Sequence, residues 1–77
     1  MLKKLNEVAV GKNCIVKKID ADGRIRRRLF DMGVTPGAQV FVRKVAPLGD
    51  PVEITIRGYE LSLRKDEAKL IIVEVNE

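Results

Sequence analysis

Short segments of alternating or β-branched apolar residues constrain the fold of this chain more than any other feature of its sequence. In VEITIR (residues 52–57) every second residue is Val or Ile, and the residues between them are polar. This period of two is typical of a strand with one buried face. Four further segments have strand character: residues 14–19, 39–46, 60–64 and 70–75. The sequence therefore predicts about five short strands.

Turn-forming residues separate the strands in the second half of the chain. The segment PLGDP, with Gly49, Asp50 and Pro51, provides one turn, and Gly58 provides another. All of this fits into a chain of 77 residues, which is too short for a second core. We therefore expect a single domain over residues 1–77, folded as a mainly β structure in the form of a small, partly open barrel.

One short helix is predicted between the first two strands, over residues 24–32. Asp20 or Asp22 can accept hydrogen bonds from the free amides of its first turn. The apolar residues of this segment recur at i, i+4 and i+7, so they form one stripe that we expect to pack against the barrel. The stripe consists of Ile25, Leu29 and Met32.

The predicted helix has a clear end. Gly33 falls where the chain must take a left-handed conformation, which only glycine adopts without strain. Val34 would then pack back against Leu29, as in a Schellman motif. Pro36-Gly37 fits the two central positions of a type II turn and would direct the chain into the next strand.

Two smaller helical pieces are also expected. KDEA (residues 65–68) is typical of a single helical turn before the last strand. Near the start of the chain, Leu2, Leu5 and Val8 are spaced by three, which predicts one helical or 3₁₀ turn closed by Gly11.

The polar faces of the main helix carry an unusual number of positive charges. The formal net charge of the chain is +4, and four of its arginines gather here. These four residues, called the arginine cluster below, are Arg24, Arg26, Arg27 and Arg28.

Three interpretations of the arginine cluster stay open. It can be the solvated face of an amphipathic helix. With Lys17 and Lys18 it could neutralise about four to six nucleic-acid phosphates, although aromatic side chains for base stacking are sparse. It can also contact an acidic protein, because arginines beside the off-stripe Phe30 are typical of interface anchors.

Composition argues against most catalytic chemistry. The chain has no His and one Cys, which removes the commonest general base and leaves too few thiolates for a metal site. No phosphate-binding loop motif is present. We therefore expect no enzyme activity, no metal site and no bound cofactor, and we interpret Cys14 as a small buried hydrophobe.

The apolar runs also bear on localisation. No N-terminal stretch resembles a signal peptide, and the longest apolar run, LIIV at residues 70–73, is too short to span a bilayer. The expected compartment is the cytoplasm.

Taken together, the motifs closely resemble the FeoA family of ferrous iron transport proteins. The resemblance is carried by RRRLFDMGVTPGAQVFV and by APLGDPVEITIRGYELSLRKDEAKLIIV, and it extends back to GKNCIVKKI. The sequence departs from the family pattern mainly in stacking four arginines at the helix. The matching positions are Leu29, Met32, Gly33, Pro36, Gly37, Pro47, Gly49, Asp50, Pro51, Gly58, Leu63, Arg64 and Ala68.

This resemblance implies an SH3-like β-barrel with helical additions. It also implies a small cytoplasmic accessory or regulatory protein, a monomer or weak homo-oligomer, that contacts the membrane transporter FeoB, whose cytosolic portion carries a GTPase domain. The matching residues carry over as architecture and none as a catalyst. We therefore expect the arginine cluster and Phe30 to dock on the transporter, with a nucleic-acid-binding small barrel as the alternative.

Overall fold

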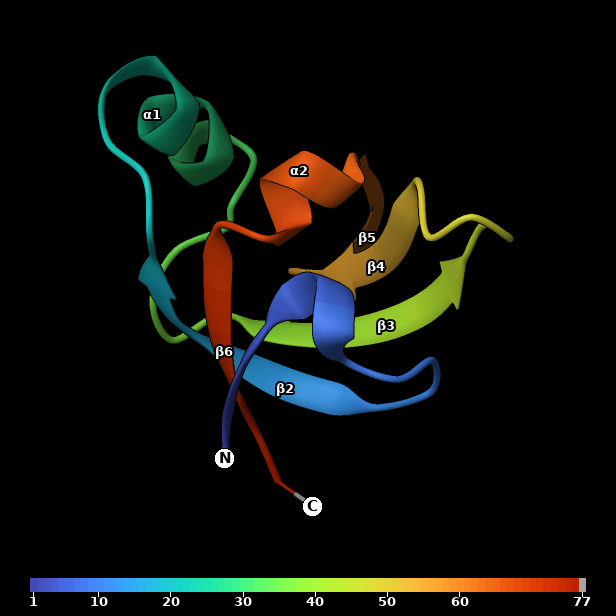
Figure 1. Ribbon diagram of the computed structural model, residues 1–77. Coiled ribbons are helices and arrows are strands. Elements are labelled where there is room, and N and C mark those ends of the chain that lie inside the picture. Colours follow the sequence, from blue (N-terminus) through green and yellow to red (C-terminus); the bar gives the residue numbers. More distant parts are fainter. Residues whose placement is uncertain (77) are drawn as a thin grey trace.

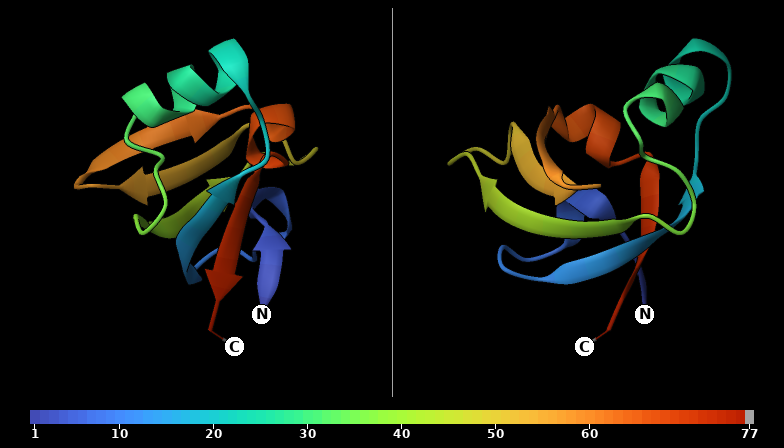
Figure 2. Two further views of the ribbon diagram at one scale, coloured as in Figure 1. Left: turned by 90° about the vertical axis from the view of Figure 1, so that its left-hand side faces the viewer. Right: turned by 180° about the vertical axis from the view of Figure 1, so that it is seen from behind.

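The computed structural model describes residues 1–76, which form a six-stranded antiparallel sheet with the strand order β1-β6-β2-β3-β4-β5. The sheet is strongly curved, and two helices lie next to each other at one end of it (Figures 1 and 2). The strands are β1 (Leu2–Lys4), β2 (Asn13–Ile19), β3 (Gln39–Val45), β4 (Val52–Ile56), β5 (Tyr59–Leu63) and β6 (Ile71–Val75). The helices are the 3₁₀ helix η1 (Leu5–Glu7), α1 (Gly23–Asp31) and α2 (Lys65–Ala68).

The five strands predicted from the apolar pattern are all present. β4 follows the pattern most closely, since Val52, Ile54 and Ile56 are buried while Glu53 and Thr55 are only partly covered. β6 repeats it with alternate buried residues along its length. The period of two therefore predicted these strands correctly, because alternate residues of β4 and β6 face the core.

The first strand, β1, was not predicted. The three-residue spacing of Leu2, Leu5 and Val8 predicted one helical or 3₁₀ turn, and a 3₁₀ turn is present at Leu5–Glu7, but Leu2 lies outside it and is 61% exposed. Residues 2–4 instead pair with β6, where Leu2 lies opposite Glu74. β6 offers hydrogen-bond partners to the backbone groups on one side of β1, which three residues of helix do not provide for themselves.

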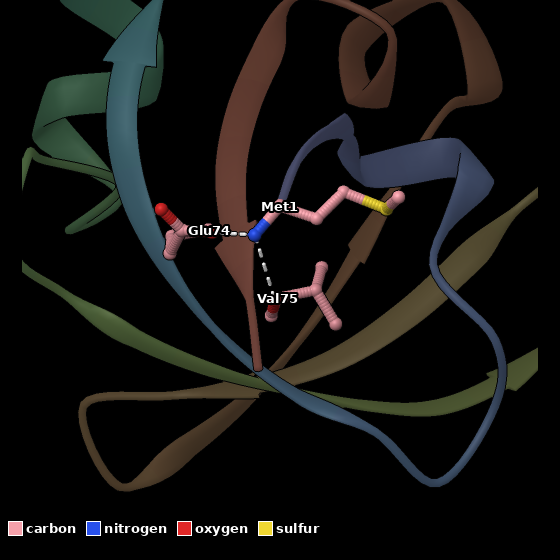
Figure 3. Close-up of polar contacts among 3 residues, drawn as sticks. All are labelled: Met1, Glu74 and Val75. Atoms are coloured by element: carbon pink, nitrogen blue, oxygen red, sulfur yellow. Dashed lines mark hydrogen bonds and ion pairs between the residues drawn. The ribbon is translucent and has the colours of Figure 1, made fainter. Parts of the chain in front are cut away.

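The two ends of the described chain are joined by polar contacts as well. The amino group of Met1 forms an ion pair with Glu74 and donates a hydrogen bond of 3.2 Å to the Val75 carbonyl (Figure 3). The backbone N–H of Val75 in turn donates to the Met1 carbonyl at 2.9 Å. These bonds extend the pairing of β1 with β6 beyond the strand itself.

The core is entirely apolar over residues 1–76, since no polar or charged residue among them is buried. Each strand from β2 to β6 contributes to it, together with Leu5 from η1, Leu29 from α1 and Ala68 from α2. Cys14 belongs to this cluster, with 3% of its surface exposed. Its role as a small buried hydrophobe is confirmed.

The end of α1 is the predicted Schellman motif. The N–H of Val34 donates to the Leu29 carbonyl at 2.9 Å, and the N–H of Gly33 donates to the Phe30 carbonyl at 2.9 Å. Gly33 has a φ of +90°, and Val34 and Leu29 are both fully buried. The glycine was therefore correctly interpreted as the residue that ends the helix.

The residues on either side of α1 agree with prediction in part. Gly37 has a φ of +93°, and the N–H of Ala38 donates to the Thr35 carbonyl at 3.0 Å, as a type II turn requires. Asp22 occupies the N-cap position, but its side chain makes no capping hydrogen bond. α1 thus begins where the sequence predicts, but Asp22 does not make the predicted capping hydrogen bond.

The turn between β3 and β4 has a second task that the sequence did not reveal. Asp50 accepts a hydrogen bond of 3.1 Å at Oδ1 from the backbone N–H of Lys65, the first residue of α2. The peptide bond between Asp50 and Pro51 is cis. The Gly49-Asp50-Pro51 segment therefore turns the chain and also holds the first turn of α2.

We predict that Gly33→Ala destabilises the protein more than Gly37→Ala. Both substitutions force alanine into a positive φ, which costs about 1–2 kcal/mol. A Cβ at Gly33 would also lie 3.1 Å from Cδ of Arg57, whereas a Cβ at Gly37 would meet no atom within 4 Å. Urea denaturation of the two variants measures the difference, and an unchanged midpoint for Gly33→Ala would contradict this helix ending.

Candidate partner-binding site

The whole arginine cluster is exposed on α1, at the end of the molecule where α1 and α2 meet (Figure 1). Its members nevertheless differ in what they contact. Two of them are held by neighbouring elements of the same chain, and two are not. The cluster is therefore not one uniform charged face.

Arg26 is held on the side of α1 that faces β2. Its guanidinium lies over the Phe30 ring, 4.6 Å from the ring centroid, and its Nη1 donates to the Ile19 carbonyl at 3.3 Å. Phe30 was expected to lie off the apolar stripe, but it is partly buried and packs against the core. Phe30 thus packs against the core beside Leu29, and Arg26 covers part of the exposed surface of its ring.

Arg28 connects α1 to α2. Its Nη1 lies 2.9 Å from Oε2 of Glu67, whose side chain is 12% exposed. The other oxygen of the same carboxylate, Oε1, accepts a hydrogen bond of 3.0 Å from the backbone N–H of Arg64. Glu67 thus caps α2 and bridges the two helices.

Arg24 and Arg27 make no hydrogen bond or ion pair with the residues that the structure describes. Both are exposed. Because their guanidinium groups have no neighbour to hold them, they are the two members of the arginine cluster that are free to bind another molecule.

A hollow of about 320 Å³ separates α1 from α2. We call it the interhelical groove, and it is lined by Ile25, Arg28, Arg64, Asp66, Glu67 and Leu70. Ile25 was predicted to pack against the barrel. That prediction is wrong, because the Ile25 side chain lines the open groove and is 49% exposed. The helix rests on the core through Leu29 instead.

Side chains at the turn between β4 and β5 form hydrogen bonds with the C-terminal end of α1. Nε of Arg57 donates to the Gly33 carbonyl at 3.0 Å, and its Nη2 donates to Oγ1 of Thr35 at 2.5 Å. The hydroxyl of Tyr59 donates to the Met32 carbonyl. A cation and a hydroxyl thus meet carbonyls that the helix leaves unpaired, and this favours the C-terminal end of its dipole.

Arg57 adopts a φ of +49°, the only positive value for a residue other than glycine in residues 1–76. Such a conformation costs energy for a side chain of this size. It persists here because the same backbone turn aims the guanidinium at Gly33 and Thr35. Sequence reasoning missed this role, although Arg57-Gly58 after an alternating strand did mark the turn.

Neither a metal-binding cluster nor a membrane-spanning helix occurs in residues 1–76. No three His, Cys, Asp or Glu side chains gather there closely enough to hold a metal ion. No helix in this part of the chain has both the length and the apolar character needed to cross a bilayer.

Comparison with known proteins assigns this chain to a protein family. The family model described as the FeoA domain matches residues 3–75. This chain belongs to the FeoA family. The match covers nearly every element described above and places the chain in a family of ferrous iron transport, which confirms the resemblance drawn from its sequence motifs.

Two solved FeoA structures share the whole architecture. The FeoA-like protein of Clostridium acetobutylicum is 42% identical, with a TM-score of 0.90 over 99% of this chain and 88% of that one. The FeoA of Stenotrophomonas maltophilia, solved with zinc and described as an SH3 domain protein, is 27% identical, with a TM-score of 0.80 over 96% of this chain and 89% of that one. The expected SH3-like barrel is therefore confirmed.

A curated FeoA relative is part of a much longer polypeptide. The Fe(2+) transport protein A/Fe(2+) transporter FeoB fusion protein of Porphyromonas gingivalis is 35% identical over 72 residues. The match covers 94% of this chain and 8% of that protein. In that organism a FeoA sequence and a FeoB sequence are thus joined in one chain.

Within this FeoA domain, the family-like motif residues are structural. Gly33, Gly37, Gly49 and Gly58 all have a positive φ and turn the chain, and Asp50 holds the first residue of α2. Leu29 is buried, and Met32 is partly covered at the end of α1. None of them adds to the exposed surface formed by Arg24 and Arg27.

We predict that Arg57→Ala destabilises this FeoA domain by about 1–3 kcal/mol, because two hydrogen bonds from a charged donor are lost. Arg57→Gly loses the same bonds but removes the strain of the positive φ, so it should be the more stable of the two variants. Thermal unfolding compares them. Equal stability of Arg57→Ala and the unchanged protein would show that the hydrogen bonds of Arg57 contribute nothing to the free energy of unfolding.

We predict that the Cys14 thiol is nearly inert in the folded domain. Burial raises the pKa of Cys14 from 9.0 to about 11, and the reactive species is the thiolate. An aromatic disulfide reagent at pH 8 should therefore modify urea-unfolded protein rapidly and folded protein very slowly. Equal rates in the two states would contradict the burial of this side chain.

The raised pKa of Cys14 also has a consequence for stability. Below pH 9 the thiol is protonated in both the folded and the unfolded state, and its contribution to the free energy of unfolding is complete. As pH rises from 9 towards 11 the unfolded chain releases this proton while the folded one retains it, so the free energy of unfolding falls. A Cys14→Ala variant should lack this part of the pH dependence.

Proposed function

We propose that this FeoA domain is a small cytoplasmic accessory protein of ferrous iron uptake that acts by contact with a FeoB-type transporter. It works by binding rather than by catalysis, as a monomer or weak homo-oligomer. The contact lies on the cytosolic region of the transporter, which includes its GTPase domain. The observation that carries the proposal is the exposed pair Arg24 and Arg27, which has no partner within the described residues.

The fusion of FeoA and FeoB sequences in Porphyromonas gingivalis supports this partner. Linking two modules in one chain raises the effective concentration of each at the other, commonly to millimolar levels for short flexible linkers. The FeoA and FeoB parts of that protein are thus kept close to each other, which supports a FeoB-type partner for this domain.

The arrangement of the arginine cluster favours a protein partner over a nucleic acid. Single-stranded nucleic acids bind to basic grooves that also present aromatic rings for stacking. Here the ring nearest the cluster, that of Phe30, is partly buried and covered by Arg26. Phe41 lies on β3, and Tyr59 is bonded to the end of α1.

We expect charge reversal of the two unpartnered arginines, Arg24→Glu with Arg27→Glu, to weaken binding to the transporter by about 1–3 kcal/mol. Neither side chain holds the fold, so the variant should unfold at nearly the same temperature as the unchanged protein. Binding should also weaken as salt rises, because contacts of exposed charges are screened. Calorimetry with the purified cytosolic region at two salt concentrations measures both effects.

The matched control reverses two charges elsewhere, Lys12→Glu with Lys44→Glu. Both lysines are exposed, and they lie at the opposite end of β2 and β3 from α1 (Figure 1). This variant has the same net charge as the first and should bind nearly as well as the unchanged protein. Equal losses for both variants would indicate non-specific attraction, and no loss for the α1 variant would place the contact elsewhere.

A further inference from the structure

We propose that the interhelical groove between α1 and α2 receives an acidic segment of the partner, which inserts an aliphatic side chain against Ile25. This inference rests on the proposed function and deepens it, because it specifies where the partner docks and the chemistry of the docking segment. Arg28, which lines the groove, and Arg24, one helical turn before it, then form the charged border of a groove with an apolar anchor point.

The apolar anchor point is the side chain of Ile25, which is exposed on a helix whose other exposed side chains are charged. Ile25 is 49% exposed, and it is the one large exposed hydrophobic residue on a helix in residues 1–76. Leu70, partly buried in the turn between α2 and β6, lines the same hollow. Two aliphatic side chains from different elements thus face a space that water fills unless another side chain enters it.

The charges around the groove select an acidic occupant. Both carboxylate oxygens of Glu67 are already bonded, one to Arg28 and one to the backbone of Arg64. Arg28 is 63% exposed and keeps further N–H donors, and Arg64 is exposed beside it. Arg24 lies one helical turn before Arg28 on the same face. The rim thus holds three guanidinium groups, those of Arg24, Arg28 and Arg64, against the two carboxylates of Asp66 and Glu67, and this excess of positive charge favours an acidic occupant.

The size of the groove limits what enters it. A volume of about 320 Å³ is at the lower end of the range for ligand pockets, about 300–1,000 Å³. It has room for the side chains of a short segment rather than for a folded element. The segment we infer is therefore a peptide stretch with one aliphatic anchor and neighbouring Asp or Glu.

The walls of the groove are fixed before binding. The Arg28–Glu67 bridge joins the two helices, Arg57 holds the end of α1, and Asp50 holds the start of α2. A surface that is already ordered loses little entropy on binding. The groove is thus ordered before a partner binds.

The test is Ile25→Ser, measured with the purified cytosolic region of the transporter. Calorimetry at low and high salt should show affinity reduced about tenfold at both, because an apolar contact is not screened by ions. The charge-reversal variant at Arg24 and Arg27 should lose affinity mainly at low salt. Thermal unfolding of Ile25→Ser checks the fold, which half-exposed Ile25 contributes to only slightly.

Leu48→Ser is the matched control. Leu48 is 90% exposed in the connection between β3 and β4, far from α1 (Figure 1), and the same type of side chain is truncated to the same residue. This variant should bind like the unchanged protein. A loss for Leu48→Ser with none for Ile25→Ser would overturn the groove and move the docking surface to that turn.

The remaining outcomes separate the two proposals. If the unchanged protein binds the cytosolic region and Ile25→Ser binds equally well, the groove is overturned and the proposed function stands. If the unchanged protein does not bind, both are overturned. Displacement of the cytosolic region by oligothymidylate, or self-association in sedimentation that Ile25→Ser abolishes, would assign the groove to a phosphate backbone or a second copy and overturn it.

Discussion

The placement of α1 depends on a small junction between the end of that helix and the turn between β4 and β5. Gly33 ends the helix with a conformation that other residues resist, and its carbonyl accepts the hydrogen bond of Arg57. Arg57 itself is in a strained conformation that is held by this contact and by Thr35. Because Leu29 is the one buried residue of α1, these polar contacts are needed to fix the helix on the barrel.

The junction explains how a helix so rich in arginine can stay on the barrel with most of its surface exposed, as the proposed function requires. A helix that packs through a narrow apolar contact leaves most of its circumference to solvent. Arg26 and Arg28 bind to neighbouring elements, to the Ile19 carbonyl and to Glu67, and these contacts help to orient the helix. Arg24 and Arg27 remain available for a partner. In the proposed function, positioning and recognition are thus divided among neighbouring residues of one cluster.

Local signals in the sequence were sufficient for the strands and the end of the helix. The alternation in β4 and the Gly33-Val34 pair both act through neighbouring residues, so their structural outcome follows from spacing alone. The strand β1 was missed because its partner, β6, lies at the other end of the chain. A pairing over so long a separation leaves no periodic signal in three residues.

The order of apolar, glycine and proline residues was sufficient to predict the barrel, most of its apolar core and the turns at Gly33, Gly37, Gly49 and Gly58. Contacts between distant segments decide which arginines lack a partner, that Ile25 lies beside a groove, and that Arg57 holds the end of α1. Helical spacing assigns Ile25 and Leu29 to one face, but burial depends on what stands opposite each. Opposite Ile25 the space between α1 and α2 stays open.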